Sequence, residues 1–233
     1  MKDELVCNDM SFHTGRHRLR ATFVKANPQK AALLFIAGGG YQPRQERYYA
    51  LHRDVFFRRH ITTFDFDFRG IGESEGTFEK TNLVTRIGDA RGALSLLKVC
   101  ADLDEVYVVG TSMGGPVAIQ VAKDPSVKGL LLVNPAAYSL EARIQNFGPD
   151  FSAAIRKPES WKNSPDFDAL QSYSGRIFLM YGTKDEVVPP DIFAKYAEIV
   201  DSKGESVCAL EGETHNSWKD QAYAWQNLIE FIE

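Results

Sequence analysis

The chain has 233 residues, 44% of them hydrophobic, which is enough for one large hydrophobic core. Its 27 basic and 31 acidic residues give a net charge of −4, so no overall field favours nucleic acid as a partner. The apolar runs are far shorter than the roughly 20 residues that span a bilayer, and the charged start lacks a signal-peptide run, so we expect a cytoplasmic protein without integral membrane association.

Short apolar runs alternate with segments of helical period along the first half of the chain. We expect strands at LRATFV (19–24), ALLFIA (32–37), ITTFDFD (61–67) and VYVVG (106–110), with a short additional first strand near ELVCN (4–8). Apolar residues that recur every three or four positions then predict a helix with one buried stripe, formed by Leu83, Ile87, Ala90, Leu94 and Leu97.

The second half of the chain continues the same alternation. Strands are expected at GLLLVN (129–134), RIFLMYG (176–182) and SVCALEG (206–212). A helix with prolines at its start is predicted for PPDIFAKYAEIV (189–200). A last amphipathic helix is predicted from the spacing of Trp218, Ala222, Trp225, Ile229 and Ile232.

Parallel strands joined by helices are the arrangement that this alternation predicts. We therefore expect an α/β fold with a mostly parallel sheet of about seven to eight strands and helices on both faces. Residues 1–233 form one domain in this interpretation, with a short cap insertion at about 135–175. The insertion is rich in aromatic residues, which either line an acyl pocket or pack on the sheet.

The segment GTSMG places Ser112 between a strand and a helix. This GxSxG pattern, in this context, is typical of a nucleophile elbow, in which a sharp turn exposes the serine and the glycines let strand and helix approach closely. An ordinary tight turn is the alternative, because glycine and serine are common turn residues. The helix that follows favours negative charge at its N-terminus, so the backbone amide of Met113 is a natural oxyanion donor.

A serine nucleophile needs a base, and the base needs a group that orients it. His215 follows the last predicted strand and precedes the last helix, at the edge of the sheet where open α/β folds collect their chemistry. Asp185 follows the preceding strand and is our choice for the orienting carboxylate, with Glu186 as a weaker candidate. The strand that ends at Asn134 supplies no carboxylate at the equivalent point.

A second oxyanion amide is expected from the glycines after the strand ALLFIA. Glycine lets the backbone approach a substrate oxygen without a side chain in the way, and Gly39 is the preferred donor, with Gly40 next. Nucleotide-binding alternatives fail on spacing, because neither GGGYQPR nor GIGESEG satisfies GxGxxG and no GK[ST] follows. The three cysteines are scattered and no His/Cys/Asp ligand cluster occurs, so no cofactor and no metal are expected.

These segments resemble the α/β-hydrolase superfamily over nearly the full chain, and within it the small serine hydrolases of serine aminopeptidase-like or lysophospholipase-like type. The resemblance rests on AGGG (37–40), DFRGIGESEG (67–76), GTSMGG (110–115), GTKDEVVPP (182–190) and GETHN (212–216). It implies the α/β-hydrolase fold, and the chain order Ser112, Asp185, His215 is the order of that family.

Two details of the resemblance concern the loops beside the site. The segment DFRGIGESEG is similar to a structural DxRGxGxS loop, so the resemblance gives Arg69 and Ser74 no catalytic role. Many relatives have His-Gly where this chain has Ala37 and Gly38, so a side chain that often braces the oxyanion loop is absent here.

The function implied is a serine hydrolase that acts on small-molecule carboxylic esters through an acyl-enzyme intermediate. Thioester hydrolysis and cofactor-free perhydrolysis are alternatives on the same triad, and a non-catalytic binding protein with a hydrolase fold is a third. The same residues are compatible with short or long acyl groups, with amide as well as ester cleavage, and with any oligomeric state.

Overall fold

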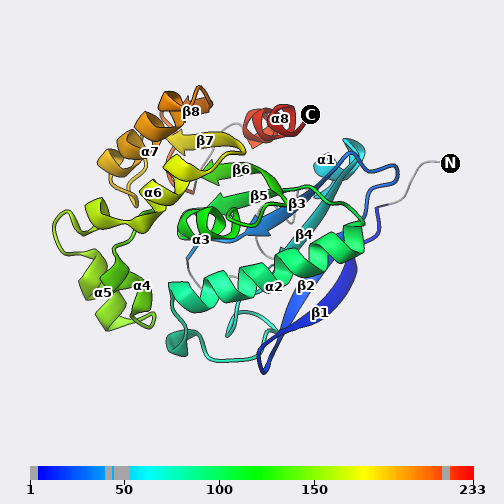
Figure 1. The fold of residues 1–233 in the computed structure, drawn as a ribbon, viewed down its shortest axis with the longest axis horizontal. Helices are drawn as coiled ribbons and strands as arrows, with labels where there is room; N and C mark the ends of the chain where they lie inside the picture. Colours follow the sequence, from blue (N-terminus) through cyan, green and yellow to red (C-terminus); the bar gives the residue numbers. More distant parts are fainter. Residues whose placement is uncertain (1–4, 40–43, 45–52, 217–220) are drawn as a thin grey trace.

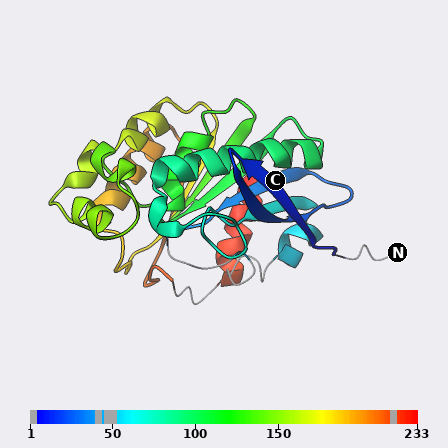
Figure 2. The same cartoon turned by 90° about the horizontal axis from the view of Figure 1, so that it is seen from below.

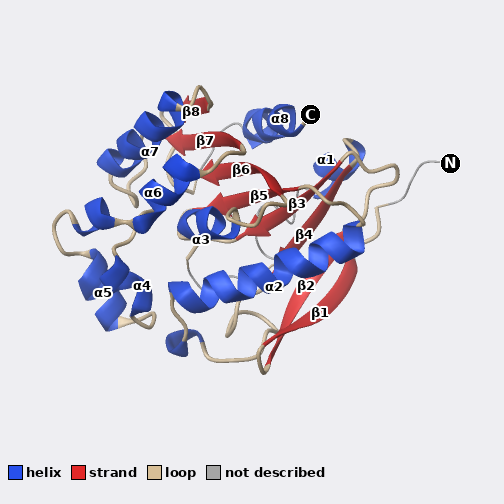
Figure 3. Ribbon diagram, in the orientation of Figure 1, coloured by secondary structure: helices blue, strands red, loops and turns tan. Residues whose placement is uncertain are grey.

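A single eight-stranded sheet organises the protein (Figures 1 and 3). The computed structural model describes residues 5–39, 44, 53–216 and 221–233. The strand order is β1-β2-β4-β3-β5-β6-β7-β8. The strands are β1 (Asn8–Thr14), β2 (His17–Val24), β3 (Ala31–Ile36), β4 (Ile61–Phe66), β5 (Val106–Thr111), β6 (Val127–Val133), β7 (Arg176–Gly182) and β8 (Ser206–Leu210).

The sheet is mostly parallel, as predicted. Strand β2 pairs antiparallel with both β1 and β4, whereas the pairs from β4 through β3, β5, β6 and β7 to β8 are all parallel. Parallel strands need crossover connections, which the helices supply. Their bounds are α1 (Arg53–Arg58), α2 (Leu83–Ala101), α3 (Gly114–Val121), α4 (Leu140–Ile144), α5 (Pro149–Ile155), α6 (Pro165–Ser172), α7 (Pro190–Ser202) and α8 (Gln221–Ile232).

Helices cover both faces of the sheet, because successive residues of each buried strand point to opposite sides. In β3, Leu34 and Ile36 belong to the cluster that packs under α2, α3 and α7, whereas Leu33 and Phe35 belong to the cluster under α1 and α8. Figure 2 shows α8 on the other side of the sheet from α2. The predicted fold class is therefore confirmed.

The first strand differs from the prediction. It runs from Asn8 to Thr14 rather than near 4–8, and a two-residue turn at Gly15 joins it to β2, so that Thr14 pairs with His17. Gly15 has a φ of +58°, a left-handed conformation that glycine adopts without steric cost. The buried side chains of Phe12 and Thr14 alternate with exposed neighbours, a pattern that the antiparallel pairing with β2 makes stable.

The remaining predicted helices lie close to their expected positions. Helix α2 spans the predicted apolar stripe, and α7 begins at Pro190. The last helix covers 221–232, while Trp218 lies outside the described residues. Between β6 and β7 the described chain contains the helices α4, α5 and α6 and no strand, and Figure 1 shows α4 and α5 next to the start of α2. That these helices form a cap remains a prediction.

Helix α3 packs against β5 at a distance that only glycine permits. A Cβ atom on Gly110 would lie 2.5 Å from the Cβ of Ala118, and one on Gly114 would lie 2.3 Å from the carbonyl oxygen of Ile36. The two glycines of GTSMG therefore let β5, α3 and the end of β3 meet around the turn that carries Ser112.

We expect Gly114→Ala to destabilise the fold by about 1–3 kcal/mol, because the added methyl group collides with backbone that has no room to move. Urea unfolding of the purified protein measures this change. The matched control is Gly88→Ala on the exposed face of α2, where an added Cβ meets nothing within 4 Å. That control should gain about 0.5–1 kcal/mol from reduced chain entropy. Equal stability of Gly114→Ala and the unchanged protein would contradict this account of the turn.

Candidate active site

Ser112 occupies a strained turn between β5 and α3. Its φ is +51°, a left-handed conformation that costs a non-glycine residue of the order of 1–2 kcal/mol. Hydrogen bonds hold the backbone in place: the Ser112 N–H donates to the carbonyl of Val133 over 2.9 Å, and the Ser112 carbonyl accepts from Gly115 at 3.0 Å and Ala136 at 3.1 Å. The side chain is half-buried at this turn.

The structure brings Ser112, His215 and Asp185 together from three loops at the carboxyl ends of parallel strands. The Oγ atom of Ser112 lies 3.0 Å from Nε2 of His215. Nδ1 of the same ring lies 2.6 Å from Oδ2 of Asp185. The Asp185 side chain is 1% exposed and that of His215 is 9% exposed, so the interaction is nearly shielded from water.

The carboxylate of Asp185 fixes the tautomer of the neutral imidazole. A carboxylate only accepts, so Nδ1 carries the proton and donates it, and Nε2 is left to accept from the Ser112 hydroxyl. Oδ1 of Asp185 also accepts the backbone N–H groups of Val187 and Val188, each at 2.8 Å. Asp185 therefore closes a turn with one oxygen and orients the histidine with the other.

Glu186, the weaker sequence candidate, contacts the same histidine differently. Its Oε2 accepts the backbone N–H of His215 at 3.4 Å, and its side chain is exposed. Glu186 thus contacts the backbone of the loop after β8, while Asp185 contacts the ring.

The glycine loop after β3 lies against the serine. A Cβ atom on Gly38 would be 3.1 Å from Cβ and 3.7 Å from Oγ of Ser112, and one on Gly39 would be 3.3 Å from Cε of Met113. Both predicted amide donors, Met113 and Gly39, therefore belong to segments that meet beside Ser112. The second candidate, Gly40, lies outside the described residues.

Asn134 was not predicted as part of the site, yet it ties two of its loops together. Its Nδ2 donates to the carbonyl of His215 at 3.0 Å, and its Oδ1 accepts the N–H of Gly182 at 2.9 Å. Asn134 itself has a φ of +44° and is 3% exposed. The signal in the sequence is a polar residue directly after a buried strand, at the edge of the sheet where the candidate site lies.

Arg86 is the second residue that the sequence interpretation missed. It lies on α2 with 2% of its surface exposed, and its Nη1 donates to the carbonyl of Gly38 at 2.8 Å. The signal was a charged residue three positions after Leu83, on the apolar stripe of the predicted helix.

The DFRGIGESEG segment makes structural hydrogen bonds. The Ser74 hydroxyl donates to the carbonyl of Asp67 at 2.7 Å and accepts the N–H of Arg20 at 2.9 Å. Arg69 donates from Nε to the buried Asp89 over 2.8 Å. Burial raises the pKa of the Asp89 carboxyl, and hydrogen bonds from Thr14 and Arg69 oppose that shift.

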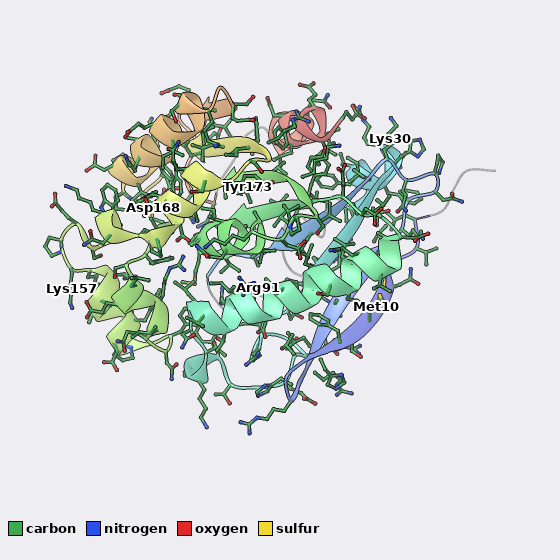
Figure 4. The ribbon with its side chains drawn as sticks, in the orientation of Figure 1. Met10, Lys30, Arg91, Lys157, Asp168 and Tyr173 are labelled. Carbon is green, nitrogen blue, oxygen red and sulfur yellow. The ribbon has the colours of Figure 1, made fainter. Side chains whose placement is uncertain are left out.

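Most aromatic residues of the 135–175 segment pack in the core. Phe147, Phe151 and Phe167 are buried, and Phe151 packs against Phe147 with ring centres 5.1 Å apart. Tyr173, at the junction of α6 and β7 in Figure 4, donates its hydroxyl to the carbonyl of Val127 at 2.9 Å. Tyr138 is partly exposed and packs on Phe151.

The described residues contain neither a helix that could span a membrane nor a cluster of metal-binding side chains. No helix in this part of the chain is both long and apolar enough to cross a membrane. Within the same ranges, no group of three or more His, Cys, Asp and Glu side chains is arranged to hold a metal ion.

The strand order and the loops that follow β5, β7 and β8 define an α/β hydrolase. Two solved structures share the fold: the Pyrococcus furiosus esterase Pf2001 (TM-score 0.75, 18% identity, covering 98% of this chain and 92% of that one), and Est1E from Butyrivibrio proteoclasticus, solved with ferulic acid bound (TM-score 0.77, 17% identity, covering 96% of this chain and 97% of that one). At these identities the likeness concerns the fold alone.

The chain belongs to the family described as serine aminopeptidase, S33, whose model matches residues 27–158. The match includes Ser112 and ends before Asp185 and His215. Among curated proteins, the chain is 26% identical over 191 residues to an uncharacterized membrane protein of Saccharomyces cerevisiae, covering 79% of this chain and 66% of that one. A second curated relative is the alpha/beta hydrolase domain-containing protein 17B of Xenopus tropicalis, to which the chain is 23% identical over 188 residues, covering 80% of this chain and 61% of that one. The chain thus spans less than two thirds of the length of these two relatives.

We expect Asn134→Gly to destabilise the protein by about 1–3 kcal/mol, because the buried N–H of Gly182 loses its acceptor. Glycine accepts the positive φ at this position, so backbone strain does not contribute to the loss. Urea unfolding gives the stability, and amide hydrogen exchange at Gly182 should become faster. Asn163→Gly, at an exposed position, is the control and should change the stability by less than about 1 kcal/mol. Unchanged exchange at Gly182 would contradict the role of Asn134.

Proposed function

We propose that the protein is a serine esterase in which Ser112 is the nucleophile, His215 the general base and Asp185 the orienting carboxylate. The observation that carries this proposal is the continuous contact from Ser112 Oγ to His215 at 3.0 Å and from His215 to Asp185 at 2.6 Å. A serine hydroxyl is a weak nucleophile at neutral pH, and a hydrogen-bonded base oriented by a third group is what activates it.

In the first step, His215 takes the proton of Ser112 as Oγ attacks the ester carbonyl carbon. The carbonyl oxygen becomes an oxyanion, which the backbone N–H groups of Met113 and Gly39 stabilise; each such donor contributes roughly 2.7–4 kcal/mol to catalysis. Met113 stands at the N-terminus of α3, where the helix dipole adds to this stabilisation. The histidine then gives its proton to the leaving alcohol, and an acyl-serine remains.

In the second step, the same histidine takes a proton from water, which attacks the acyl carbon. A second tetrahedral oxyanion collapses, Ser112 recovers its proton from His215, and the carboxylic acid leaves. The residues therefore act as base and acid in turn, and the free enzyme returns unchanged.

Carboxylic esters with small or medium acyl groups are the substrates we propose. The segment of residues 135–175 is short, and its aromatic rings pack on one another and on the core, which favours an open site. An esterase function also agrees with the hydrolase family of the chain. A thioester series alongside the ester series tests the thioesterase alternative directly.

Replacing the nucleophile provides the primary test. A fluorophosphonate should add once to the purified protein, as read by intact mass, and not at all to Ser112→Ala, because only the activated serine reacts. Hydrolysis of p-nitrophenyl esters should fall by about 10⁴-fold or more in Ser112→Ala. The matched control is Ser95→Ala on the exposed face of α2, which should label and turn over normally. No adduct on folded protein would instead favour the non-catalytic hydrolase-fold alternative.

Substitutions of the two acidic residues in the loop after β7 should have very different effects on kcat. Asp185→Asn should lower kcat by about 10⁴-fold, because an amide donor facing Nδ1 puts the imidazole proton on Nε2, where it cannot accept from Ser112. Glu186→Gln keeps an acceptor for the His215 N–H and should remain within a few-fold of the unchanged enzyme. Steady-state kinetics on a p-nitrophenyl ester measures both variants. A reversed result would transfer the orienting role to Glu186.

A further inference from the structure

Arg86 is a charged residue buried beneath the loop that follows β3. It is 2% exposed, and its guanidinium carbon lies 4.6 Å from the ring centre of Phe68 and 4.7 Å from that of Phe147. A third ring, that of Phe78, lies 5.9 Å away. The faces of aromatic rings attract a guanidinium, and this attraction is stronger where water is excluded. The side chain is therefore held in place by rings from three separate segments.

The guanidinium binds the peptide group between Gly38 and Gly39. Nη1 of Arg86 donates to the Gly38 carbonyl over 2.8 Å. That carbonyl and the N–H of Gly39 belong to one planar trans peptide, so they point in opposite directions. Holding the oxygen against Arg86 on one side fixes the direction of the Gly39 N–H on the other.

A contact from outside the loop is needed to orient this peptide, because glycine residues on both sides leave the flanking φ and ψ angles unusually free. Gly38 and Gly39 carry no side chain that could fix their orientation. The residue before Gly38 is Ala37, whose methyl side chain cannot form a hydrogen bond that would hold the loop. The hydrogen bond to a cation also polarises the peptide, which makes its N–H a stronger donor.

We infer that Arg86 is a positioning residue that directs the Gly39 N–H toward the oxyanion formed on attack by Ser112. The inference rests on the proposed esterase function and adds a residue on α2 to it. One of the three rings around Arg86, that of Phe147, belongs to the segment between α4 and α5, so that segment also helps to set the orientation of the Gly38–Gly39 peptide.

The test variant is Arg86→Met, which keeps an apolar stem between the rings and removes the charge and the hydrogen bond. The number of active sites is titrated with fluorophosphonate, and we expect kcat per active site to fall by about 10- to 100-fold. This decrease is no larger than the decrease in kcat that removal of a complete oxyanion donor causes. KM should stay nearly unchanged, because the peptide acts on the transition state. Affinity for an alkylboronic acid, which forms a tetrahedral adduct, should fall by the same factor as kcat/KM.

Two further variants separate positioning from a structural role. Arg86→Lys restores a donor for the Gly38 carbonyl and should recover part of the lost kcat. Arg91→Met, at an exposed position on the same helix (Figure 4), is the matched control and should keep the kinetics of the unchanged enzyme. A purely structural role of Arg86 would lower the number of titratable sites and the unfolding midpoint while leaving kcat per site unaltered.

A readout that does not depend on turnover completes the test. The backbone amide resonance of Gly39 should shift in Arg86→Met and stay in place in Arg91→Met. Unaltered kcat per site in Arg86→Met, or a loss of kcat without loss of boronic acid affinity, would overturn the inference and leave the esterase proposal standing. Absence of ester turnover and of labelling in the unchanged protein would instead overturn the esterase proposal.

Discussion

The left-handed turn at Ser112 is the constraint on which the arrangement of the site depends. A serine with a φ of +51° is stable only where its surroundings hold it. Here the holding contacts are backbone hydrogen bonds to Val133 and Ala136 and the close approach of α3 to β5 at Gly110 and Gly114. Because Gly114 also touches the end of β3, the same packing sets the position of the glycine loop beside the serine.

Hydrogen bonds with three side chains, those of Asp185, Asn134 and Glu186, hold the His215 ring and its backbone in position. Asp185 uses one carboxylate oxygen for two backbone N–H groups and the other for the ring of His215. Asn134 joins the end of β7 to the His215 carbonyl, and Glu186 accepts the His215 N–H. The loops after β6, β7 and β8 are thus tied to one another, and in the proposed mechanism this preorganises His215 as the base.

The features set by local pattern could be predicted from the sequence, and those set by distant partners could not. Strands β3 to β8 appear as apolar runs, and the GxSxG turn is contiguous in the chain. Strand β1 was misplaced because its register follows from antiparallel pairing across Gly15. Arg86 and Asn134 have partners 48 and 81 residues away, Gly38 and His215, so no short segment contains both members of either pair.

Two buried arginines connect residues that follow β3 to residues 67–68: Arg86 of α2 links Gly38 to Phe68, and Arg44 itself binds Asp67. Arg86 lies against the ring of Phe68 and holds the Gly38 carbonyl, while Arg44 donates from its backbone and from Nη1 to the carboxylate of Asp67, at 2.6 and 2.8 Å. The proposed oxyanion amide of Gly39 must face the substrate, so side chains cannot pack against that side of the peptide. The hydrogen bond from Arg86 to the Gly38 carbonyl holds this peptide from the side opposite its N–H, which leaves the N–H free for the proposed reaction.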